Sequence, residues 1–115
     1  MKDTLFLLQA PFLDPKLGDT PYHCPYCAHL EGMLSYHPQL RDQLEVVYVG
    51  FTRPRAAIVA LLGEGQQGCP VLVVGDTARH GDDVQQAATG QYFVSDSKTI
   101  AHYLGRHYGV TVPHP

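Results

Sequence analysis

Two of the three cysteines stand three positions apart, as Cys24 and Cys27 around a Pro-Tyr dipeptide. Pro25 suits the first turn of a helix, because its missing N–H group would have no partner there. A cysteine at the start of a helix meets unpaired backbone N–H groups and the positive end of the helix dipole, which favour the nucleophilic thiolate. Cys27 lies one turn further on the same face, where it can attack a mixed disulfide formed at Cys24. The spacing therefore predicts a dithiol site for thiol–disulfide exchange.

A metal site is the second interpretation of the same pair. Cys24 and Cys27 would supply half of the ligands of a zinc or iron–sulfur centre, and Cys69 with His23 would complete a set of four. The third interpretation is a pair of unreactive thiols in a non-catalytic module that binds a partner through its loops. The sequence leaves these alternatives open.

Composition limits the classes of protein to consider. The chain has 115 residues, which suffices for one small core, so we expect a single domain over residues 1–115. The formal net charge of −3 argues against nucleic-acid binding, which needs clustered Lys and Arg. Apolar runs are too short for a membrane span or a secretion signal, and three cysteines are few for a disulfide scaffold. We expect a cytoplasmic protein with no membrane partner.

Strands and helices must alternate along the chain to position the cysteines. Short apolar or β-branched runs predict strands, and Gly- and Pro-rich segments separate them from stretches with helical periodicity. Strands are expected at Thr4–Gln9, Leu44–Phe51, Val71–Val74 and Gln91–Val94, and helices from Cys24 to Tyr36, from a cap at Thr52 to Leu62, and from a cap at Ser95 or Asp96 to Tyr108.

The resulting order is β-α-β-α-β-β-α, with the first two strands parallel and the last two antiparallel. It predicts an α/β sandwich: a four-stranded mixed sheet with helices on both faces. Residues 10–23 and 76–90 are expected to be long loops, the second one partly helical at 84–88.

Three motifs, in this order, resemble those of glutaredoxins and of the N-terminal domains of glutathione transferases. Cys24–Cys27 (CPYC) is similar to the glutaredoxin active site, Cys69–Val71 (CPV) to the segment before the third strand, and Asp96-Ser97 to the pair that opens the last helix. The resemblance implies a thioredoxin-like, glutaredoxin-type three-layer fold, in a member of an uncharacterised bacterial glutaredoxin-like family. Against this pattern, the two long loops are insertions.

The resemblance also implies roles for individual residues. Cys24 would attack a disulfide and Cys27 would resolve the product, with glutathione as co-substrate, a protein disulfide as the other substrate and no permanently bound cofactor. Cys69 would lie near the pair, so that three sulfurs converge. The residues expected to bind glutathione or substrate are Tyr26, a cis Pro70, the exposed backbone of Val71, Asp96 and Ser97.

Two basic residues, Arg53 and Arg55, flank Pro54 at the expected start of a helix. A cation at this place opposes the helix dipole, and a bound anion would offset that cost. With the resemblance, one of the two arginines is expected to bind the glycine carboxylate of glutathione.

Overall fold

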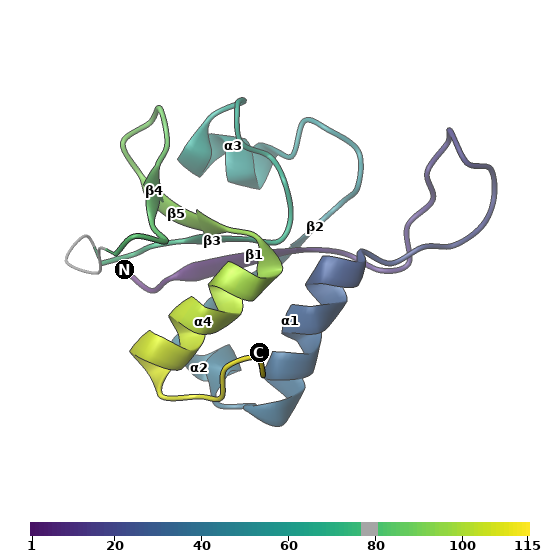
Figure 1. Ribbon diagram of the computed structural model, residues 1–115. Helices are drawn as coiled ribbons and strands as arrows, with labels where there is room; N and C mark the ends of the chain where they lie inside the picture. The colour runs from purple at the N-terminus through teal and green to yellow at the C-terminus, as the bar shows by residue number, and fades with distance from the viewer. Residues whose placement is uncertain (77–80) are drawn as a thin grey trace.

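The computed structural model describes residues 1–76 and 81–115, and four helices and five strands are defined in them (Figure 1). In chain order the elements are β1 (Thr4–Leu8), α1 (Pro25–Tyr36), α2 (Leu40–Gln43), β2 (Glu45–Val49), α3 (Ala56–Leu62), β3 (Val71–Val73), β4 (Gln85–Gln86), β5 (Tyr92–Ser95) and α4 (Ser97–Tyr108). Every strand and helix expected from the sequence has a counterpart, and the mixed α/β class is confirmed.

The five strands form one mixed sheet in the order β2-β1-β3-β5-β4. β1 and β2 are parallel, as their connection through a helix requires, and the other neighbouring pairs are antiparallel. The predicted orientations of the first and last strand pairs are therefore confirmed.

The predicted number of four strands is wrong, because β4 lies in the segment 76–90 that the sequence predicts to be a loop with a helical part at 84–88. β4 pairs with β5 at the edge of the sheet, and both of its side chains are exposed. Two exposed polar residues show no apolar alternation, so periodicity does not reveal such a strand. Residues 77–80 of the same segment lie outside the described residues.

Helices cover both faces of the sheet, with α3 above it and α1, α2 and α4 below it in the view of Figure 1. Alternation along β1 divides the core between these faces. Leu5 and Leu7 belong to the buried cluster that includes residues of α1 and α4. Phe6, which lies between them, packs with Ile58 and Leu62 of α3 instead. β1 is thereby held from both sides.

The helices differ from the sequence prediction at two places. The N-cap of α3 is Arg55 rather than Thr52. The residue before a proline is disfavoured in helical conformation, so Arg53 interrupts any helix that would run from Thr52 through Pro54. The short helix α2, anchored by the buried Leu40, is too brief to show a period in the sequence. Among the described residues, none of the helices has both the length and the apolar character needed to cross a membrane.

The arm (residues 10–23) projects from the sheet near the start of α1 (Figure 1). Phe12 and Tyr22 exchange two backbone hydrogen bonds, of 2.9 and 2.8 Å, so that the arm closes on itself. The ring of Phe12 stacks on that of Phe51, with 4.6 Å between the ring centroids. These contacts fix the base of the arm on the loop after β2.

Candidate functional site

Cys24 is the N-cap residue of α1, immediately before Pro25 at the first helical position. Its Sγ accepts a hydrogen bond of 3.2 Å from the backbone N–H of Cys27, one of the donors that the helix itself leaves unpaired. The side chain is partly exposed. Cys24 thus lies where the sequence predicts it, at the positive end of a helix, a position that stabilises negative charge.

Cys27, three residues after Cys24 on the first turn of α1, faces the core and is only 3% exposed. Burial raises the pKa of its thiol to about 12, and a hydrogen bond with Cys24 and the charges of Cys24 and Cys69 act in the same direction. The backbone N–H of Leu8, 3.4 Å from Cys27 Sγ, partly opposes this shift. The pair therefore consists of one accessible thiol and one buried thiol that holds its proton at neutral pH.

Cys69 and Pro70 face this pair from the turn before β3. The peptide bond between them is cis, as the resemblance implied. Cys24 Sγ lies 4.0 Å from the carbonyl oxygen of Cys69. Burial raises the pKa of the Cys69 thiol, while the positive charges of Arg55 and Arg53 lower it. The three cysteines are close enough for the charge of one thiol to raise the pKa of another.

A pocket of about 300 Å³ is lined by Cys69 and by residues of three separate segments. It brings together most of the predicted substrate-binding residues. These are Tyr26 at the start of α1, Pro70 before β3, and Asp96 and Ser97 at the start of α4. Tyr26 is 63% exposed, whereas Ser97 is 6% exposed. The arm contributes no residue to this pocket.

The structure does not bring Val71 to the pocket, contrary to the sequence prediction. Val71 is fully buried, and its strand lies between β1 and β5, where it faces Phe6 on one side and Ser95 on the other. Its backbone is thus unavailable to a substrate. The backbone group that lies beside Cys24 Sγ is instead the carbonyl of Cys69, two residues before Val71.

Arg55 is a structural side chain, so the prediction that it serves as a free carboxylate ligand is wrong. It is 7% exposed, and its guanidinium donates two hydrogen bonds to the carbonyl of Phe51 and one, of 2.8 Å, to the carbonyl of Gln67. Its positive charge lowers the pKa of the nearby Cys69 thiol. Arg55 therefore ties two loops together next to the sulfurs.

Arg53 remains available for an anion. It is exposed and lines a second pocket, of about 410 Å³, together with Lys16 of the arm and Phe51. The positive charge of Arg53 also contributes to lowering the pKa of the Cys69 thiol. The prediction that one of the two arginines binds a carboxylate stays a prediction; both line this pocket, and Arg53 is the exposed one.

The residues of the metal alternative do not assemble as a ligand set. His23 is exposed, and among residues 1–76 and 81–115 no group of three or more His, Cys, Asp or Glu side chains is arranged to hold a metal ion. Cys24, Cys27 and Cys69 are all free thiols.

Three further residues of the pocket were not identified from the sequence: Gln66, Gly68 and Ser95. Gln67, beside them, fixes Arg55 by accepting from its backbone N–H and donating to the carbonyl of Glu64. The Gly- and Gln-rich composition of this segment is typical of a linker. Adjacency is the signal that was available, because Gly68 and Ser95 directly precede two of the predicted motifs.

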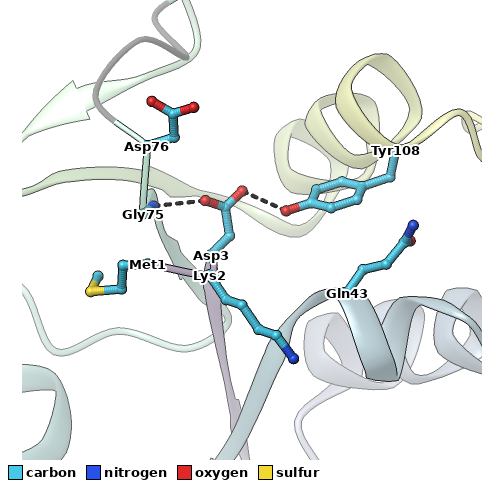
Figure 2. A pocket seen from close by; sticks show the side chains of 7 residues that line it. All are labelled: Met1, Lys2, Asp3, Gln43, Gly75, Asp76 and Tyr108. Atoms are coloured by element: carbon cyan, nitrogen blue, oxygen red, sulfur yellow. Dashed lines mark hydrogen bonds between the residues drawn. The ribbon is translucent and has the colours of Figure 1, made fainter.

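A larger cavity, of about 660 Å³, lies at the opposite end of β1 (Figure 2). There the buried carboxyl of Asp3 accepts hydrogen bonds from the N–H of Gly75 (2.7 Å) and from the hydroxyls of Tyr103 (2.7 Å) and Tyr108 (2.9 Å). A Cβ on Gly75 would overlap the carbonyl oxygens of Met1 and Lys2. The close approach of the segment after β3 to the segment before β1 therefore requires glycine. These bonds hold the sheet to α4, and no cysteine lines this cavity.

No curated protein and no solved structure matches this chain. One family does match, over residues 2–112, and its description is a protein of unknown function (DUF3088). Since the match spans nearly the whole chain, this protein belongs to the DUF3088 family.

Proposed function

We propose that this protein is a thiol–disulfide oxidoreductase of the glutaredoxin type, with a thioredoxin-like fold and with glutathione as co-substrate. The position of Cys24 carries the proposal. Its Sγ is partly exposed and caps α1, and it accepts the N–H of Cys27 at 3.2 Å. Helix N-termini of this kind activate cysteine nucleophiles. The parallel β1–α1–β2 unit, the antiparallel β3–β5 pair and the closing helix α4 support the fold.

In the proposed reaction, the thiolate of Cys24 attacks one sulfur of a substrate disulfide and expels the other as a thiolate, which takes up a proton. The product is a mixed disulfide at Cys24. Cys27 then releases its proton to the solvent and attacks Cys24 Sγ, which expels the second substrate thiolate and forms the Cys24–Cys27 disulfide. The substrate has gained two electrons and two protons. Two molecules of glutathione reduce the protein again and leave as oxidised glutathione.

When the mixed disulfide is with glutathione, a second glutathione molecule offers a faster route than Cys27, because the pKa of Cys27 is high. A thiol with a pKa of about 12 rarely ionises at neutral pH, so its attack on Cys24 is slow. A second glutathione molecule can attack the Cys24–glutathione disulfide without Cys27. The pocket formed by Tyr26, Pro70, Asp96 and Ser97 would hold the glutathione moiety, and we assign its carboxylate to Arg53, which lines a separate pocket.

A turnover assay tests this function. The protein is supplied with a glutathionylated peptide, glutathione and a glutathione-recycling system. We expect Cys24→Ser to abolish turnover, because the nucleophile is lost, and Cys27→Ala to retain most of it, because glutathione resolves the intermediate. Wild-type protein that does not deglutathionylate the peptide, or Cys24→Ser that remains as active as wild type, would contradict the proposal.

A further inference from the structure

Cys69 takes no part in the reaction proposed above, yet it occupies the wall of the same pocket. It lines the pocket with Tyr26, Pro70 and Ser97 and is partly exposed. Cys24 does not line this pocket, but its Sγ lies 4.0 Å from the carbonyl oxygen of Cys69, so the two residues are neighbours. Cys27, by contrast, lies beneath Cys24 in the core, 3% exposed. Cys24 therefore has one cysteine below it and another beside it.

Two arginines act against burial, which on balance raises the pKa of the Cys69 thiol. The guanidinium of Arg55, which three hydrogen bonds to backbone carbonyls hold in place, lies close enough for its charge to lower the pKa of Cys69. The exposed Arg53 adds a second positive charge. Cys27 has no cation beside it and receives only the N–H of Leu8. A thiolate next to a guanidinium is stabilised relative to one in an apolar core.

We propose that Cys69 is a third redox thiol, which forms a disulfide with Cys24 as an alternative to Cys27. In turnover this step rests on the proposed function. The thiolate of Cys69 attacks Cys24 Sγ of the mixed disulfide, the Cys24–substrate S–S bond breaks, and the substrate leaves as a thiolate that takes up a proton. The Cys24–Cys69 disulfide formed carries the two electrons' worth of oxidation that the substrate disulfide has given up. Thiol–disulfide exchange with Cys27 or glutathione then returns Cys69 to the reduced state.

The electrostatics of the three sulfurs agree with this sequence of steps. Burial raises the pKa of Cys69, Arg55 opposes that effect, and the charge of Cys24 raises the pKa further. Once Cys24 is in a mixed disulfide its charge is gone, so the repulsion between the two sulfurs disappears at the moment when Cys69 must ionise.

The test uses the full chain carrying Cys27→Ala, which removes the other partner of Cys24. The variant is equilibrated at low concentration with oxidised dithiothreitol, then free thiols are blocked with N-ethylmaleimide and the intact mass and peptide map are measured. We expect a monomer that has lost two hydrogen atoms, takes up no label and yields peptides joined through Cys24 and Cys69. The matched control, Cys27→Ala with Cys69→Ser, must keep Cys24 free for labelling or bound to the small thiol.

Labelling at both thiols in Cys27→Ala, or dimers linked only through Cys24, overturns the inference. Cys27→Ser is the second variant, closer in size to cysteine, and circular dichroism verifies that each variant is folded. The outcome is separable from that of the proposed function, because dithiothreitol equilibrates thiols whether or not Cys24 is activated. Turnover of glutathionylated peptide without a Cys24–Cys69 disulfide refutes the inference alone. The disulfide without turnover refutes the proposed function alone and leaves Cys69 as a redox thiol.

Discussion

Cys24 and Cys27 show how strongly the position on one helical turn determines the properties of a thiol. Cys24 lies at the N-cap, outside the first turn, and is partly exposed to solvent. Cys27 lies at the third helical position, where the side chain points into the core beside β1. Burial of Cys27 raises its pKa to about 12, although the N–H of Leu8 acts against this. Two cysteines three positions apart therefore differ in exposure: Cys24 is partly exposed and Cys27 is buried.

The titration of Cys27 predicts a loss of stability at alkaline pH. The unfolded chain releases this proton near the ordinary value of 9.0 and the folded chain near 12, so between these values the folded protein binds more protons. Raising the pH therefore favours unfolding. The contribution of Cys27 is complete below pH 9.0 and is lost progressively toward pH 12. We expect the free energy of unfolding to fall by up to about 1.4 kcal/mol per pH unit in this window.

Urea unfolding at about pH 8 and about pH 10.5 measures this effect, with Cys27→Ala as the matched variant. The variant retains the tyrosines and lysines, whose titration also contributes, so the difference between the two proteins isolates Cys27. Equal pH slopes for wild type and Cys27→Ala would show that burial does not hold the proton on this thiol.

At the scale of elements, the start of α4 both caps the helix and lines the pocket. Asp96 is the N-cap residue, and its Oδ2 accepts from the backbone N–H of Thr99 (3.2 Å) and from the hydroxyl of the same residue (2.9 Å). Its φ of 74° lies in a region that non-glycine residues rarely adopt, and such backbone strain concentrates at binding sites. The cap holds Asp96 and Ser97 at the pocket.

Two substitutions of Asp96 separate these roles. Asp96→Ala removes the cap and is expected to cost about 1 kcal/mol of stability, whereas Asp96→Asn keeps an acceptor and costs about 0.5 kcal/mol or less. Both remove the negative charge, so both are expected to raise the KM for glutathione, by about tenfold. Thermal unfolding and steady-state kinetics measure the two effects. An unchanged KM in Asp96→Asn would limit Asp96 to capping.

At the scale of the whole molecule, Asp3 holds together elements that lie at the end of the sheet remote from the cysteines. It is 2% exposed and joins β1 to the turn after β3 through Gly75 and to α4 through Tyr103 and Tyr108 (Figure 2). Cys27, in contrast, lies against Leu8, at the other end of β1. The hydrogen bonds of Asp3 and the buried Cys27 therefore lie at opposite ends of β1.

Tyr103→Phe tests this separation. The substitution removes one hydroxyl from a fully buried side chain and leaves the carboxyl of Asp3 with one bond fewer. We expect a loss of about 2 kcal/mol in the free energy of unfolding. The rate at which Cys24 is alkylated should stay the same as in wild type. A changed alkylation rate would mean that the two ends of the sheet are coupled.

The sequence predicts the main elements and the cysteine site because these depend on strong local signals. Pro25 marks the start of α1, and apolar runs mark β1 and β3. The parts that it misses depend on pairing or packing between distant segments. Val71 is buried because β3 is central, and Arg55 is occupied by carbonyls from two loops, neither of which a local pattern reveals. β4 is defined only by its pairing with β5.

The rate of Cys24 alkylation at neutral pH tests the central claim most directly. Cys24→Ser serves as the control that identifies the labelled thiol, and free cysteine is the reference. An activated thiolate at the N-cap of α1 predicts that iodoacetamide modifies wild-type protein at neutral pH at least about tenfold faster than free cysteine, with Cys24 as the modified residue. A rate equal to or below that of free cysteine would contradict the account.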